Sequence, residues 1–191
     1  MATIKKSALV LYSAADMYAL VSDVEAYPGF LPWCRSASIV NHTEDEVRAT
    51  IEMAKGRVHK SFTTINRMQK HKMIDIRLLE GPFQRLQGYW RFESLRANAS
   101  KVSLDMEFEF SSHLLQMAIE PVFKQIANSL VDAFCKRAVD VYGKRWPRHP
   151  PGRGGLRPAR RAGHHPGRGA GGRDRGTGDR PVAHPGTLPG N

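Results

Sequence analysis

The stretch VSLDMEFEFSSHLLQMAIEPVFKQIANSLVDAFCKRAVDVYG, residues 102–143, contains two hydrophobic periods in succession. Its first nine residues alternate strictly, with Val102, Leu104, Met106, Phe108 and Phe110 on one face and Ser103, Asp105, Glu107 and Glu109 on the other. Alternation with one polar face is typical of an antiparallel strand. We therefore interpret the acidic residues as solvated and the apolar ones as facing inward.

A helical period follows. Beyond Pro121, apolar residues recur as one stripe at Val122, Phe123, Ile126, Leu130, Phe134 and Ala138. This predicts a helix over residues 121–142, about 33 Å long, with Gly143 as its C-cap. Pro121 either starts the helix or kinks it, and we expect LLQMAI before it to form another helical turn or two.

The remaining chain predicts about seven strands. Period-two or β-rich segments occur at the N-terminus, near residues 36–42, in VRATIEM, VHKSFTTI, IDIRL and LQGYWRFE, and in residues 102–110. Ser13, followed by Asp16, predicts the start of a helix over residues 14–24. The long helix must bury its stripe against the strands, so we expect an α+β fold with the sheet curled around that helix.

The segment VEAYPGFLPWC, residues 24–34, places Tyr27, Phe30, Leu31 and Trp33 around two prolines. Prolines restrict the residues before them, so at most a short turn is expected at residues 29–31. We expect this segment to close one end of the interior, with Trp33 inward. Phe30 and Leu31 are then candidates for a lid or a membrane-touching edge; the alternative is that they plug the core.

Composition divides the chain after Trp146. Residues 147–191 contain 12 Gly, 8 Pro and 9 Arg but no Lys and no aromatic residue, which predicts a disordered tail. Residues 1–146 carry a net charge of +4 and the tail +7. The tail is either a product of GC-rich sequence read in a frame or past a stop, or a basic arm for RNA or anionic lipid. Residues 1–146 suffice for one domain.

Features of catalysis, disulfides and targeting are weak. His42, His59, His71 and His113 form no metal-binding pattern, no nucleotide or hydrolase motif occurs, and we expect no metal, no cofactor and no enzymatic activity. Cys34 and Cys135 are far apart, which favours reduced thiols. Without a signal peptide or an apolar run of about 18 residues, a cytoplasmic protein is expected.

Inward faces of the strands combine methionine with aromatic residues: Met53, Trp90, Phe92, Met106, Phe108 and Phe110. Such side chains suit irregular apolar space. Composition alone is compatible with a close-packed core or with a ligand cavity.

Three segments carry a family resemblance. LVSDVEAYPGFLPWC, EGPFQRLQGYWRFE and AFCKRAVDVYG resemble the coenzyme Q-binding START-like family, also named polyketide cyclase/dehydrase, which includes bacterial RatA ribosome-association toxins. The resemblance covers residues 2–146. It implies a helix-grip (START-like) fold with an apolar cavity between sheet and helix.

The resemblance also implies a function. Its first implication is non-enzymatic carriage of ubiquinone or a related isoprenoid in support of respiration, with transient contact at the inner membrane and no DNA partner. The alternative is a toxin that binds the large ribosomal subunit and blocks subunit association; a cyclase/dehydrase enzyme ranks third. Gly81 and Pro82 would form a turn that leaves Phe83 at a cavity mouth. Candidate cavity residues are Phe30, Leu31, Trp33, Met53, Phe83, Leu86, Trp90, Phe92, Met106, Phe108, Phe110, Phe123 and Ile126.

Overall fold

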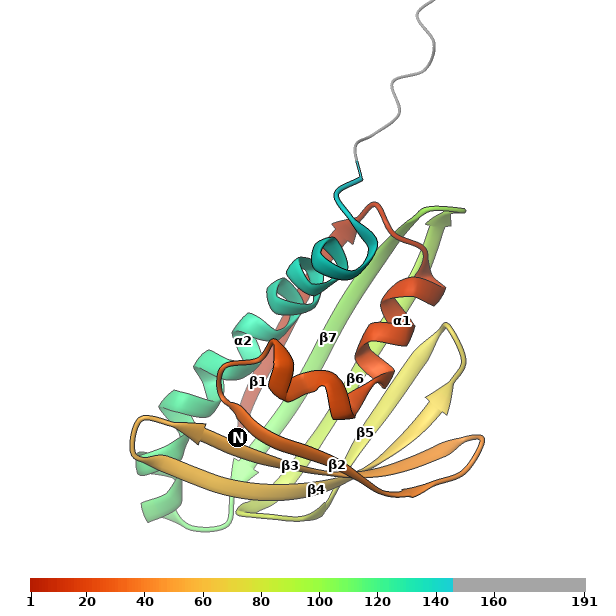
Figure 1. Ribbon diagram of the computed structural model, residues 1–191. Coiled ribbons are helices and arrows are strands. Elements are labelled where there is room, and N and C mark those ends of the chain that lie inside the picture. The colour runs from red at the N-terminus through yellow and green to blue at the C-terminus, as the bar shows by residue number, and fades with distance from the viewer. Residues whose placement is uncertain (146–191) are drawn as a thin grey trace, which may run out of the picture. The chain divides into compact units, whose positions relative to one another are not determined.

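The computed structural model describes residues 1–145 as one antiparallel sheet with helices on one side (Figure 1). The strands are β1 (Ala2–Val10), β2 (Cys34–His42), β3 (Glu46–Lys55), β4 (Val58–Gln69), β5 (Met73–Glu80), β6 (Phe83–Arg96) and β7 (Ala99–Phe110). The helices are α1 (Ala14–Ser22), the 3₁₀ helix η1 (Val24–Gly29) and α2 (His113–Tyr142). The prediction of a disordered tail over residues 147–191 lies outside the described residues.

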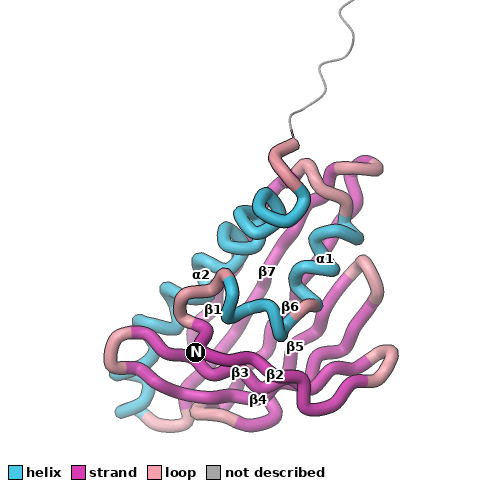
Figure 2. The backbone as a smooth tube through the Cα atoms, viewed as in Figure 1, coloured by secondary structure: helices cyan, strands magenta, loops and turns pink. Residues whose placement is uncertain are grey.

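The sheet has the strand order β1-β7-β6-β5-β4-β3-β2, and every neighbouring pair is antiparallel. Only β1 lies out of chain order, because it pairs with β7 at the far edge. Both α-helices cover the same side of the sheet (Figure 2). The seven-stranded α+β architecture predicted from the alternating segments is confirmed.

Helix α2 begins eight residues earlier than the predicted position 121. The Ser112 hydroxyl accepts a hydrogen bond from the Leu115 N–H at 3.2 Å and caps the helix there. Pro121 therefore stands inside the helix, not at its start. At the other end Gly143 adopts φ 79°, and its N–H donates to the Val139 carbonyl, which confirms the predicted C-cap. With 30 residues, α2 is about 45 Å long.

The first helix and the proline-rich segment also differ from expectation. Ser13 caps α1 as predicted, its hydroxyl accepting from the Asp16 N–H at 3.0 Å, but α1 ends at Ser22. The expected turn at residues 29–31 is replaced by η1, five residues earlier, with Pro28 inside it. The buried Tyr27 hydroxyl donates to the Val21 carbonyl at 2.5 Å, which ties η1 back to the end of α1.

The core lies between the concave face of the sheet and the helices. Buried and half-buried residues alternate without exception along β7, as its sequence predicts. Helix α2 packs against β1, β7 and α1, and its side chains at Phe123, Val131 and Phe134 are buried there. Helix α2 packs more closely against β1 and β7 than against β4.

Candidate functional site

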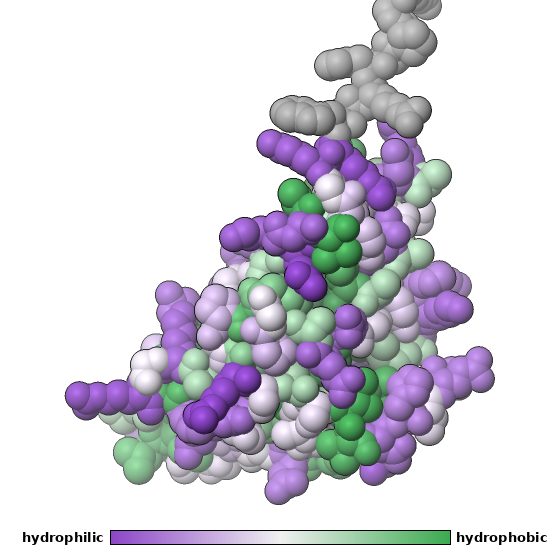
Figure 3. Space-filling model, in the orientation of Figure 1, coloured by the Kyte–Doolittle hydropathy of each residue, from purple (hydrophilic) through white to green (hydrophobic). Residues whose placement is uncertain are grey.

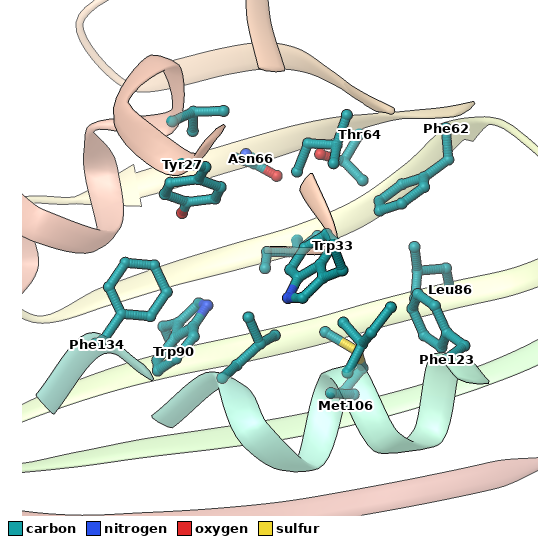
Figure 4. A pocket seen from close by; sticks show the side chains of 16 residues that line it. Tyr27, Trp33, Phe62, Thr64, Asn66, Leu86, Trp90, Met106, Phe123 and Phe134 are labelled. Atoms are coloured by element: carbon teal, nitrogen blue, oxygen red, sulfur yellow. The ribbon is translucent and has the colours of Figure 1, made fainter. Parts of the chain in front are cut away.

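An apolar cavity of about 80 Å³ lies between α2 and the concave face of the sheet (Figure 4). Strands β3 to β7 form its floor, and α2, η1 and the residues before β2 form the rest of the wall. The lining residues are Val24, Tyr27, Trp33, Ile51, Phe62, Thr64, Asn66, Ile76, Leu86, Trp90, Met106, Phe123, Ile126, Ala127, Leu130 and Phe134.

The strand register determines which side chains reach the cavity. Leu86 and Trp90 lie on the inward face of β6, and Met106 projects from the paired position opposite Gly88. Gly81, in the turn before β6, has φ 151°, and a β-carbon there would lie 2.6 Å from the Phe62 β-carbon. Glycine is therefore required in the predicted Gly81-Pro82 turn, which sets where β6 starts.

Two polar side chains interrupt the apolar wall on β4. Thr64 and Asn66 are only 4% and 8% exposed. Among the residues that the structure describes, the Asn66 Oδ1 atom has no hydrogen-bond partner. A buried, unpaired acceptor is unusual in a folded protein and calls for a physical explanation.

The wall carries no charge. Its described residues include no carboxylate, imidazole, amine or guanidinium group. Burial raises the pKa of the Tyr27 phenol well above its ordinary value, so Tyr27 is neutral in the fold. Next to the wall, burial and then the Glu52 carboxylate raise the pKa of the Cys34 thiol to about 11, which disfavours the nucleophilic thiolate. This arrangement can hold an uncharged apolar molecule.

Six of the thirteen candidate residues lie on the cavity wall: Trp33, Leu86, Trp90, Met106, Phe123 and Ile126. They come from the two strands β6 and β7, the pre-β2 segment and α2. Whether they contact a ligand remains a prediction.

Five candidates belong to the close-packed core instead: Met53, Phe83, Phe92, Phe108 and Phe110. Phe83 is not at a cavity mouth. Its ring stacks on Phe110 at 4.8 Å and meets Phe123 edge-on at 5.0 Å, and Phe108 lies 4.7 Å from Phe123. From the sequence, this end of the interior could be a packed core or a cavity. The aromatic cluster fills it, so it is a packed core.

The two lid candidates are also placed differently. Leu31 is 1% exposed, so it is a core residue and not a membrane-touching edge. Phe30 is half-buried, with its ring 5.3 Å from Phe134 and under the Arg137 guanidinium at 5.0 Å. Trp33 points inward, as expected. The plugging alternative describes Leu31 correctly.

Sequence reasoning missed ten wall residues: Val24, Tyr27, Ile51, Phe62, Thr64, Asn66, Ile76, Ala127, Leu130 and Phe134. The most informative are Thr64 and Asn66. In the string FTTIN, the apolar Ile65 is the residue that one would expect to face inward. The strand register instead turns Phe62, Thr64 and Asn66 inward. Counting in steps of two from Phe62 is the signal that finds them.

Residues 1–145 contain neither a metal-binding cluster nor a membrane-spanning helix. This range contains no group of three His, Cys, Asp or Glu side chains arranged to hold a metal ion. None of its helices combines the length and apolarity needed to cross a bilayer.

Known proteins resemble the chain in sequence and in fold. The family model described as polyketide cyclase / dehydrase and lipid transport matches residues 10–135. The ribosome association toxin RatA of Pseudomonas aeruginosa is 41% identical over 140 residues, which cover 73% of this chain and 97% of that protein.

Two further similarities are more distant. The mitochondrial coenzyme Q-binding protein COQ10 homolog B of Xenopus laevis is 27% identical over 73% of this chain and 59% of its own length. The solution structure of an 18 kDa protein from Caulobacter crescentus has 31% identity and a TM-score of 0.61, covering 75% of this chain and all of that one. The START-like helix-grip fold implied by the three sequence segments is thereby confirmed.

Proposed function

The chain belongs to the polyketide cyclase / dehydrase and lipid transport family, and from this premise we propose that it acts by associating with ribosomes. The observation that carries the proposal is a sequence identity of 41% to a ribosome association toxin, over 97% of the length of that protein. In its finer form, the proposal is that the protein binds the large ribosomal subunit and hinders subunit association. This was the second of the functions implied by the sequence motifs.

A basic hairpin offers a surface for such an interaction. The β3–β4 turn and its flanks contain Lys55, Arg57 and Lys60, with no acidic residue between positions 54 and 60. Arg57 and Lys60 are exposed. The Lys55 ammonium donates to the Gln125 Oε1 atom at 2.9 Å, which links the hairpin to α2. Clustered Lys and Arg side chains bind nucleic-acid phosphates with release of counterions.

On the convex face of the sheet, two of the arginines are already paired with carboxylates. Arg77 donates to Asp75 at 2.8 Å, and Arg91 pairs with Asp105. On the other side of the molecule, where the helices lie, Figure 3 shows hydrophilic side chains spread over the surface, with hydrophobic ones in separate groups. We therefore choose the β3–β4 hairpin for the test.

Sedimentation of ribosomal particles with the full chain tests the proposal. We expect the protein to migrate with large subunits at low salt, and the double variant R57E/K60E to lose most of that association. If both residues contact phosphates, the slope of log K against log salt falls by roughly 1.4 to 1.8. The matched control K70E/K72E changes the same charge at the β4–β5 turn, at the other end of β4. A wild-type chain that stays at the top of every gradient refutes the function.

The cavity supports a second proposed function, binding of a small apolar ligand. A volume of about 80 Å³ corresponds to roughly five to eight water positions, and hence to about one isoprene unit. Each buried CH₂ group contributes about 0.8 kcal/mol. A complete polyprenyl tail exceeds this volume, so carriage of ubiquinone requires the interior to enlarge.

Mass spectrometry of an organic extract of the purified protein tests this second function. A stoichiometric isoprenoid or other lipid supports it; an extract without one, together with no uptake of an added isoprene-sized alcohol or hydrocarbon, refutes it. The family description also includes cyclases and dehydrases. Those reactions need a positioned acid or base, and Tyr27, with its raised pKa, is the single titratable side chain among the described residues of the wall.

A further inference from the structure

We propose that the Asn66 carboxamide, with the Thr64 hydroxyl beside it, recognises an uncharged apolar ligand that carries a hydroxyl group, such as a short isoprenoid alcohol. The inference rests on the ligand-binding function proposed above and names the class of ligand. Its starting point is the unpaired Asn66 Oδ1 atom on the wall of an otherwise apolar cavity.

The position of Asn66 follows from the register of β4. Asn66 pairs with Val47 on β3 and with Ile76 on β5, so both flanking strands present apolar side chains beside it. Thr64 lies two residues earlier on the same inward face, and Figure 4 shows the two side chains as neighbours on the wall. The polar pair Thr64 and Asn66 is therefore buried at positions where two apolar side chains would avoid the free-energy cost of burying polar groups.

A hydrogen-bond donor on the ligand would satisfy the orphaned acceptor. An unpaired buried acceptor is destabilising, because the atom has lost its hydrogen bonds to water without gaining another. A ligand hydroxyl donates to Asn66 Oδ1 and removes that penalty on binding. An ether or a ketone of the same shape offers the Oδ1 atom no donor.

The wall also selects against charge. A carboxylate placed beside Asn66 would be buried without a cationic partner, because the described lining residues carry none. Burying an unpaired ion is far less favourable than burying a hydroxyl group. The chemistry of the site thus favours alcohols over fatty acids.

A matched set of small probes tests the inference on the full chain. Prenol, its methyl ether, 3-methyl-2-butenoic acid and 2-methyl-2-butene share one isoprene-sized skeleton and fit the volume of the cavity. Binding is followed by NMR titration through the indole N–H signals of Trp33 and Trp90, both on the wall. We expect prenol to bind about tenfold more tightly than its methyl ether, which is the value of one good hydrogen bond.

Three variants assign that preference to its residue. Asn66→Leu should abolish the advantage of prenol while the hydrocarbon still binds, and Asn66→Ala repeats the test should the leucine disturb the fold. Thr63→Val serves as a control, because Thr63 lies on the opposite face of β4 and hydrogen-bonds to Thr50 at 2.7 Å. Its probe preferences should match those of the wild type.

The outcomes separate this inference from the function on which it rests. If the hydrocarbon binds but the ether binds as tightly as prenol, or if Asn66→Leu keeps the preference, the role of Asn66 is refuted and ligand binding stands. If none of the four probes binds the wild-type chain, the ligand-binding function falls and this inference with it.

Discussion

Replacing Phe134 with alanine should strongly destabilise the fold, because this ring joins η1, the pre-β2 segment and β6 to α2. Phe134 is 1% exposed. Its ring centroid lies 5.4 Å from Tyr27, 5.3 Å from Phe30 and 5.4 Å from Trp90, each in an edge-on arrangement. No other ring in the described residues connects the same three partners.

The expected loss follows from these contacts. Truncating a buried phenylalanine to alanine costs about 3 to 5 kcal/mol, and the three ring pairs place Phe134 in the upper half of that range. Domains are typically stable by only about 5 to 15 kcal/mol. We therefore expect the free energy of unfolding to fall by about 4 to 5 kcal/mol, which corresponds to a melting temperature lower by roughly 10 to 20 °C.

Urea unfolding followed by circular dichroism measures the change. Leu114→Ala is the control, because Leu114 is 78% exposed at the start of α2 and its truncation should stay within about 0.5 kcal/mol. The enlarged cavity should also take up benzene more tightly than the wild-type cavity does, so benzene should raise the melting temperature of the variant by more. A loss below about 2 kcal/mol would refute the packing described for Phe134.

Two further substitutions probe the cavity and its surroundings. Ala127→Leu places three more carbon atoms into the cavity, so uptake of prenol should fall at least tenfold by NMR titration while co-sedimentation with ribosomal particles is unchanged; parallel loss of both would contradict two separate functions. Tyr27→Phe removes the hydrogen bond to the Val21 carbonyl and should cost about 1 to 2 kcal/mol in urea unfolding. Because the pKa of Tyr27 is raised in the fold, the unfolded chain loses this proton first, and the free energy of unfolding should fall as pH rises above about 10. A Tyr27→Phe variant with the same alkaline slope as the wild type would show that other groups cause it.

Local patterns predicted the elements correctly where a single period runs undisturbed. Strict alternation in residues 102–110 matches the burial of β7 residue by residue. The stripe at Phe123, Ile126 and Phe134 is buried on α2. The sequence allowed Pro121 to start the long helix or to lie inside it. The Ser112 cap decides for the second, because a capped and packed helix tolerates one proline, and the turns expected at LLQMAI are part of α2.

The candidate site was harder to predict because both a core and a cavity are built from inward apolar residues. Phe83, Phe108 and Phe110 satisfy the inward pattern as well as Trp90 and Met106 do. Only ring-to-ring packing around Phe123 decides that the first three fill space and the last two border it. No sequence pattern measures how completely side chains from distant strands fill the volume between them.

By itself, the sequence determined the order of the elements, the antiparallel sheet, the long C-terminal helix and the family, because each depends on short-range periodicity or on contiguous motifs. The tertiary structure decided the position and size of the cavity, the burial of Leu31 and the inward turn of Asn66. These depend on the register between β3, β4 and β5 and on how far α2 stands from them. A shift of one residue in that register would exchange Asn66 for Ile65, so the polar group in the apolar wall is a property of strand pairing.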